Sequence, residues 1–190
     1  PYLVEQLFTM SDNGQYALAA RVLLTPRALV GVAVGEAFRA ELMARLHRRE
    51  PVTRWVLSII AKMALVALLA FALVAAIAPP AFGLVFGEAF REAGGLLRVL
   101  APAALGQFVV FPLAFVFVAT GRVRLGMWVQ LVASVLPLIH LWVGARAGNV
   151  GYALALYSVG SIVAACVVIA LATYCCRATD RAQLGAAHAA

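Results

Sequence analysis

The sequence predicts an all-α integral membrane protein, a bundle of helices that crosses the bilayer several times. Hydrophobic residues make up 65% of the 190 residues and charged residues only 12%, whereas a soluble domain is about half apolar and a quarter charged. The mean hydropathy is +0.98. The apolar residues also form runs long enough for a helix to cross about 30 Å of hydrocarbon.

Five complete spans and the end of a sixth are expected. The complete spans are predicted over 16–46, 55–78, 96–119, 124–143 and 152–176, and 1–10 is interpreted as the outer end of a further span. The chain starts without Met and in the middle of an apolar run, which we interpret as truncation at the N-terminus. A transmembrane lobe over 1–177 and a cytoplasmic tail over 178–190, which is expected to fray, complete the domain assignment.

Turn residues set the expected boundaries of these spans. Pro79-Pro80 is expected to end the span over 55–78, because proline lacks the N–H that continues a helix, so 79–90 is predicted to be a loop. Only a few residues around Gly121 separate the next two apolar runs. Those two runs are therefore predicted to form an antiparallel transmembrane hairpin.

The distribution of arginine predicts the orientation. The connector over 45–54 carries four arginines, the 79–90 segment carries none, and the turn over 121–124 carries two. Cytoplasmic loops are enriched in Lys and Arg. We therefore expect the connector, the turn and the C-terminus to be cytoplasmic. This pattern also explains the net charge of +7 without a nucleic-acid partner.

Two stretches resemble one family. One begins with Phe82-Gly83 and continues through LLRVLAPAALGQF over 96–108 to ATGRVRL over 119–125; the other is GQYALAAR over 14–21. Together they are similar to the polysaccharide and O-antigen flippases of the multidrug/oligosaccharidyl-lipid/polysaccharide exporter superfamily. The resemblance implies one lobe of a two-lobe transporter in the bacterial inner membrane. Its expected partners are the bilayer, a missing N-terminal lobe and a lipid-linked oligosaccharide with an anionic diphosphate.

Arg27 is the strongest candidate for contact with that substrate. It lies roughly 16 Å along the helix from Tyr16, near mid-bilayer, where a cation costs about 2.5–3.5 kcal/mol unless a partner offsets it. Tyr16, Gly31 and Phe38 share its face at 100° per residue. This face is expected to line a cavity, and Tyr16 is a further candidate for substrate contact. Two alternatives remain: an intramembrane ion pair with an acid of the missing lobe, and a shallower position if Pro26 starts a new helix.

Three further residues are weaker candidates. Arg21 and Arg98 are candidate substrate ligands, Arg98 for a phosphate of the outer leaflet. An interfacial cation explains Arg21 equally well and is the favoured interpretation of Arg98. Glu36 is the only acid in the membrane part of the first helix, which makes it the proton-coupling candidate there.

No enzyme, cofactor or metal site is expected, because no nucleophile elbow, phosphate loop or metal-spaced His/Cys set occurs in the sequence. The three cysteines, Cys166, Cys175 and Cys176, are interpreted as packing residues. Three alternatives to the flippase remain: a multidrug and toxic compound extrusion-type antiporter, a membrane-embedded transferase, and a non-transporting scaffold of envelope biosynthesis.

Overall fold

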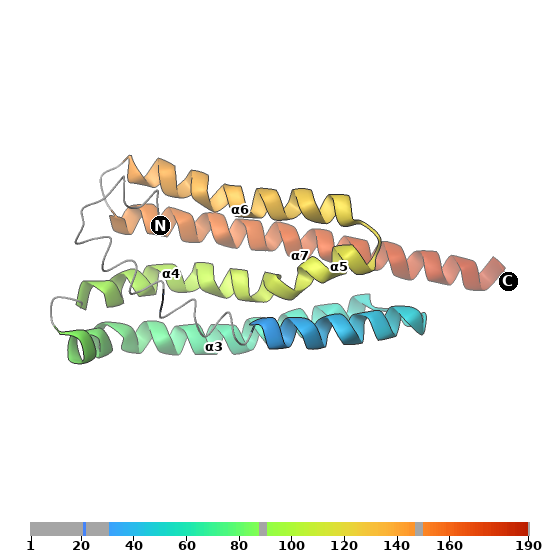
Figure 1. The fold of residues 1–190 in the computed structure, drawn as a ribbon, viewed down its shortest axis with the longest axis horizontal. Helices are drawn as coiled ribbons and strands as arrows, with labels where there is room; N and C mark the ends of the chain where they lie inside the picture. Colours follow the sequence, from blue (N-terminus) through green and yellow to red (C-terminus); the bar gives the residue numbers. More distant parts are fainter. Residues whose placement is uncertain (1–20, 22–30, 88–90, 147–149, 190) are drawn as a thin grey trace.

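Every element of the described chain is a helix. The computed structural model describes residues 21, 31–87, 91–146 and 150–189. After a helix over 31–47 come α3 (Thr53–Phe86), α4 (Arg91–Val110), the 3-10 turn η2 (Phe111–Leu113), α5 (Ala114–Ala119), α6 (Val123–Ala145) and α7 (Val150–Ala189). Figure 1 shows them as one elongated bundle. The predicted all-α class is confirmed for these residues.

Four helical segments are long and apolar enough to cross a membrane: Thr53–Phe86, Ala93–Ala119, Val123–Ala145 and Gly151–Gly185. They correspond to four of the five complete spans that the sequence predicts. The remaining predicted span is helical over 31–47, and its earlier part lies outside the described residues, as does 1–10. The described part of the chain thus has the architecture of a multi-pass membrane protein with four candidate spans. The structure does not confirm the predicted fifth complete span or the end of a sixth.

The helices pack in the order α3, α4, α7, α6, each mainly against the next. Figure 1 shows the start of α3, the α5–α6 turn and the C-terminal end of α7 at one end of the bundle. The end of α3 and the starts of α4 and α7 lie at the other end. The predicted hairpin around Gly121 is present: Gly121 has φ +70°, and Arg122 N donates to Phe117 O at 2.8 Å, which closes α5 in a Schellman motif.

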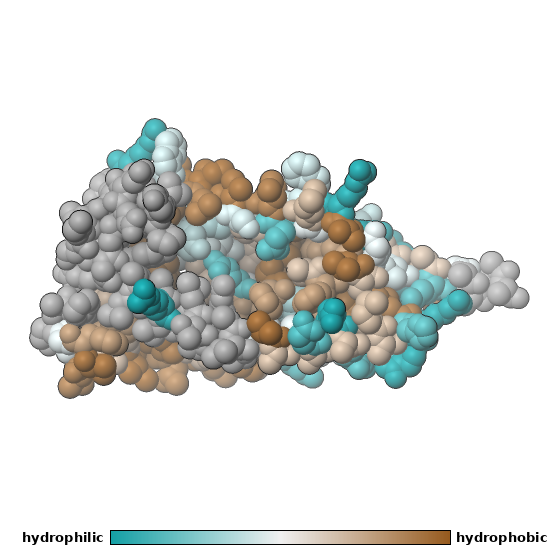
Figure 2. All heavy atoms as spheres, in the orientation of Figure 1, coloured by the Kyte–Doolittle hydropathy of each residue, from teal (hydrophilic) through white to brown (hydrophobic). Residues whose placement is uncertain are grey.

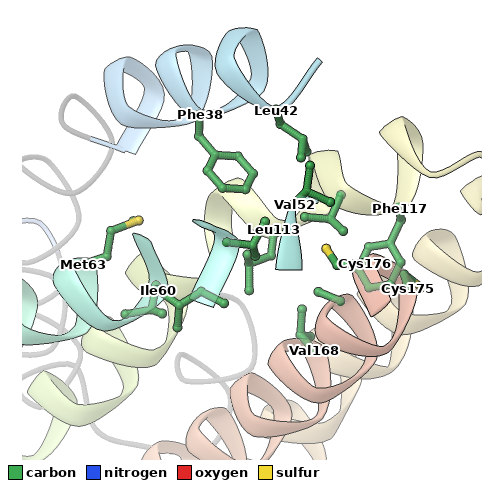
Figure 3. Close-up of a cluster of buried hydrophobic side chains, with 14 of the residues drawn as sticks. Phe38, Leu42, Val52, Ile60, Met63, Leu113, Phe117, Val168, Cys175 and Cys176 are labelled. Carbon is green, nitrogen blue, oxygen red and sulfur yellow. The ribbon is translucent and has the colours of Figure 1, made fainter. Parts of the chain in front are cut away.

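Among the described residues the core consists of two clusters, one toward each end of the bundle. Figure 3 shows the larger one, where Phe38 and Leu42 of the 31–47 helix approach side chains of α3, η2 and α7. On α3 the buried stripe is Val56, Ile60, Met63 and Ala67. This spacing of three and four residues places them on one face of the helix.

The rest of the helix surfaces stays apolar and exposed. In the most apolar window of α3 only 17% of residues are buried within the chain. Figure 2 shows hydrophobic residues over α3 and α6, and hydrophilic residues gathered toward the end where the C-terminus projects. Each Å² of apolar surface exposed to water costs about 25 cal/mol. Monomeric soluble proteins rarely expose so large a continuous apolar surface. Lipid or a further protein surface therefore covers these faces.

The prediction that Pro79-Pro80 ends the span is wrong, because α3 continues through both prolines to Phe86. The two prolines cannot donate to the carbonyls four residues earlier, those of Ala75 and Ala76. Arg98 of α4 supplies the missing donors: its Nε lies 2.7 Å from Ala75 O and its Nη2 lies 3.3 Å from Ala76 O. A side chain from the neighbouring helix thus repairs the break. Residues 79–86 belong to the helix, and α3 ends at Gly87, where φ is +91°.

The tail that was expected to fray is helical as far as Ala189. Asp180 holds it against the start of α3: its two carboxylate oxygens accept hydrogen bonds from Val52 N at 2.9 Å and Thr53 N at 3.1 Å. The first N–H groups of a helix lack intrahelical partners and attract negative charge. Because Val52 provides no side-chain cap, the carboxylate from α7 takes that role.

Candidate functional site

A half-open cleft of about 410 Å³ lies between α4, α6 and α7. It exists because α6 packs along α7 and meets the α4–α5 segment mainly at α5, so α4 and α6 diverge over the surface of α7. We call it the α4–α6 cleft. Its polar lining residues are Gln107 of α4, Gln130 and Ser134 of α6, and Tyr157 and Ser161 of α7.

Helical spacing and small residues build the cleft. Gln130 and Ser134 are four residues apart, as are Tyr157 and Ser161, so each pair shares one face of its helix. On the opposing surfaces, a Cβ at Gly106 would lie 3.3 Å from the Ala165 Cβ. This close approach lets α4 and α7 touch at their small residues and leaves the longer polar side chains around the opening.

Hydrogen bonding in the cleft is incomplete. Gln107 Nε2 donates to the Tyr157 hydroxyl at 3.0 Å, and Ser134 Oγ donates to the Gln130 carbonyl at 2.9 Å. Ser161 is 3% exposed, yet its hydroxyl has no hydrogen-bond partner among the described residues. A buried polar group without a partner costs about 1–3 kcal/mol, so water or a ligand is needed at this point.

The described part of the lining carries no formal charge. None of the described residues around the cleft is Asp, Glu, Lys, Arg or His. Nearby on α6, His140 lies outside the lining: its Nδ1 is 2.8 Å from the Leu136 carbonyl. It also packs on Gly160, where an added Cβ would come within 2.9 Å of the ring. The chemistry of the cleft is therefore that of neutral amides and hydroxyls.

The predicted site residues lie away from this cleft or outside the described chain. Arg27 and Tyr16 fall outside the described residues, so their predicted substrate contacts stay predictions. Arg21 is helical and exposed. Glu36 is paired with Arg39 of its own helix, with 3.2 Å between Oε2 and Nη2, and its side chain is 58% exposed. The proton-coupling candidate thus has a cation beside it at the bundle surface.

Arg98 serves the backbone of α3. Its Nε and one of its terminal nitrogens are engaged by the two carbonyls that the prolines leave free. A guanidinium that offers these donors to a phosphate would first have to leave Ala75 and Ala76. The geometry thus gives Arg98 a structural role that neither sequence interpretation, phosphate ligand or interfacial anchor, included.

The helix face that was expected to line a cavity packs against the bundle over its described part. Cβ atoms built at Gly31 and Gly35 would lie 3.6 Å and 3.1 Å from the Phe111 ring. Phe38 is buried and stacks on Trp55, with 5.2 Å between ring centroids. Its small and aromatic residues serve helix packing at these positions, as the Gly-x-x-x-Gly spacing suggests.

The residues of the cleft were not predicted. None of its polar residues, Gln107, Gln130, Ser134, Tyr157 and Ser161, entered the candidate set. A usable signal does exist in the sequence: two polar pairs at i and i+4, each inside an apolar helix. Their convergence on Gln107 depends on helix packing, which no single segment encodes.

Within the described residues no group of three His, Cys, Asp or Glu side chains is placed to hold a metal ion. The architecture and the cleft define the class: a polytopic helical membrane protein with an uncharged polar cleft. Comparison with protein-family models, with curated proteins and with solved structures finds no match for this chain.

Proposed function

We propose that the chain is one lobe of a membrane transporter that flips a lipid-linked oligosaccharide from the cytoplasmic to the periplasmic leaflet of the bacterial inner membrane. The α4–α6 cleft carries the proposal. Polar groups facing hydrocarbon are costly, so amides and hydroxyls that converge inside an apolar bundle call for water, a second protein surface or a polar substrate. A two-lobe transporter supplies all three.

Two further features support this assignment. The stretch that resembles the flippases runs from the end of α3 through α4 and η2 to the α5–α6 turn, and it contributes Gln107 of α4 and Phe111 of η2 to the cleft. The arginines of the 45–54 connector lie at the same end of the bundle as the α5–α6 turn and the C-terminus. That grouping favours a cytoplasmic C-terminus by the positive-inside rule. Substrate would then enter from the cytoplasmic side, and the lobes would rock to expose it outward.

The lining of the cleft weighs against the main alternative. An antiporter for cationic drugs needs acids in its cavity, and the described lining has none, while Glu36 is paired with Arg39. A transferase or a scaffold would not need an open polar cleft at membrane depth. The flippase therefore remains the best-supported function, with Arg27 as the proposed ligand of the diphosphate.

The test is a flipping assay on the complete polypeptide in liposomes. A fluorescent lipid-linked oligosaccharide is placed in both leaflets, and its loss to an impermeant quencher is followed over time. We expect Arg27→Ala to lower the rate at least about tenfold, because a hydrogen bond to a charged group contributes about 1.5–3 kcal/mol. Arg27→Lys should retain part of the rate, since the charge stays and the bidentate geometry is lost.

Three outcomes separate the possibilities. No flipping by the wild-type protein would overturn the transporter proposal. Normal flipping by a stable Arg27→Ala protein would overturn the diphosphate role alone. Loss of abundance in Arg27→Ala, rescued by neutralising an acid elsewhere in the polypeptide, would assign Arg27 to a structural ion pair.

A further inference from the structure

We infer that the α4–α6 cleft is reached by water within the membrane and binds the carbohydrate part of the transported molecule, an uncharged ring that carries hydroxyl groups. The carbohydrate identity rests on the proposed function. The access of water does not, because it follows from the cleft alone.

The functional groups of the cleft match hydroxyls. A hydroxyl both donates and accepts hydrogen bonds, and a glutamine amide offers two donors and an acceptor. Gln107 and Gln130 bring such amides from α4 and α6, and Tyr157 adds a phenolic hydroxyl from α7. The amide of Gln130 makes no hydrogen bond to another described residue. Its donors and acceptor are therefore available to a ligand.

The absence of charge in the described lining narrows the ligand class. A diphosphate or a cation in this cleft would meet no opposite charge among the lining residues. An unpaired ion in a medium of low polarity is strongly disfavoured, whereas a neutral polar group needs only hydrogen bonds. The uncharged part of a lipid-linked saccharide meets this condition, and its diphosphate does not.

Size and apolar contacts also fit a sugar ring. A volume of about 410 Å³ falls within the range of small-molecule sites, about 300–1,000 Å³. Phe111 is 47% exposed and belongs to the lining, so its ring offers an apolar surface beside the amides. A pyranose has hydroxyls at its edge and C–H groups on its faces, and such a pair of surfaces accommodates both.

The opposite side of α6 provides an internal contrast. A second groove, of about 180 Å³, lies between α6 and α7 and is lined by apolar residues such as Trp128, Val132 and Val167. Val132 and Ser134 are two positions apart, about 3 Å along the helix axis. One face of α6 thus suits acyl chains and the other suits a polar ligand at nearly the same depth.

This contrast gives a matched test of water access. Ser134→Cys and Val132→Cys are made separately in the complete polypeptide, with the exposed Cys166 changed to Ala and the buried Cys175 and Cys176 retained. A hydrophilic methanethiosulfonate reacts with the thiolate, which forms in water and not in hydrocarbon. We expect Ser134→Cys to react at least about tenfold faster than Val132→Cys. Equal rates would overturn the access of water.

Protection from this reagent tests the ligand. A polyprenyl-diphosphate disaccharide should slow the labelling of Ser134→Cys, and the same polyprenyl diphosphate without sugar should not. Equal protection by both lipids would assign the cleft to the lipid or its phosphates, and protection by neither would leave it as a water-filled space. Either result overturns the inference of carbohydrate binding.

A substitution completes the test. Gln130→Leu keeps the approximate shape of an exposed side chain while removing its amide, and Val132→Ala serves as the control on the apolar groove. We expect Gln130→Leu to weaken protection at Ser134→Cys at least about tenfold, and Val132→Ala to leave it unchanged. If the disaccharide lipid protects Ser134→Cys but the protein does not flip that lipid, only the transporter proposal is overturned. If the protein flips the lipid but the lipid gives no protection, only the inference of carbohydrate binding is overturned.

Discussion

The Nε of Arg98 lies 2.7 Å from the carbonyl oxygen of Ala75, an oxygen that Pro79 leaves without its helical partner. The same side chain reaches Ala76, the carbonyl freed by Pro80, at 3.3 Å. One guanidinium thus replaces two missing backbone donors, and its planar fork suits the task because it presents several N–H groups in a fixed geometry.

We predict that Arg98 and the two prolines are energetically coupled. Arg98→Ala should lower the free energy of unfolding by about 1–3 kcal/mol, because two backbone carbonyls within an apolar span lose their partners. In a Pro79→Ala/Pro80→Ala background the backbone donors return, and Arg98→Ala should cost much less. Unfolding in mixed micelles measures both steps of this double-mutant cycle. Equal costs in the two backgrounds would show that Arg98 acts elsewhere.

Two adjacent glycines of α4 should respond to alanine with opposite signs. A Cβ at Gly94 would lie 2.5 Å from Pro79 Cα, whereas a Cβ at Gly95 meets nothing within 4 Å. We expect Gly94→Ala to destabilise by about 1–3 kcal/mol through overpacking, and Gly95→Ala to stabilise by up to about 1 kcal/mol through helix propensity. Thermal unfolding in detergent compares the pair. The same sign at both positions would contradict the close contact between α3 and α4.

The start of α3 should depend on Asp180. Asp180→Ala removes the carboxylate that accepts from Val52 N and Thr53 N, and loss of such a cap costs about 0.5–2 kcal/mol. Asp180→Asn keeps one acceptor and should cost less. Hydrogen exchange at the first turn of α3 reports the effect locally. Unchanged exchange in Asp180→Ala would mean that water caps this end equally well.

The orientation prediction can be tested on the two ends of α3. Arg54 and the exposed Val85 lie about 45 Å apart along the helix, farther than the hydrocarbon thickness. In a Cys166→Ala background, an impermeant thiol reagent added to intact cells should label Val85→Cys. Arg54→Cys should react only after permeabilisation. The reverse pattern would invert the predicted topology.

Apolar run length predicted most of the fold. The spans of α4–α5, α6 and α7 start near the expected residues, and the turn at Gly121 forms where the sequence places it, because span length and a glycine turn are local properties. The end of α3 was mispredicted for a nonlocal reason: the helix-breaking effect of Pro79 and Pro80 is offset by Arg98, which lies on another helix. The same holds for the tail, which Asp180 attaches to α3.

The candidate site was less predictable than the fold. Gln107 has only apolar neighbours in the second half of α4, and Gln130 has only apolar neighbours on either side in α6; each alone is compatible with simple packing. Only the order α3, α4, α7, α6 brings them to one cleft. Arg27 differs from these residues, because the free-energy cost of a cation at mid-bilayer depends only on that residue and its depth. The sequence alone is therefore enough to predict a role for Arg27.

The contact between Val52 and Asp180 spans 128 residues of sequence, and this separation has a consequence in time. Ribosomes add about 5–20 residues per second, so the start of α3 waits roughly 6–26 s after its synthesis for the carboxylate that caps it. Throughout that interval the first N–H groups of α3 depend on water. The arrival of α7 therefore closes the connection that fixes the start of α3, and this helix end has its carboxylate cap only after α7 has been made.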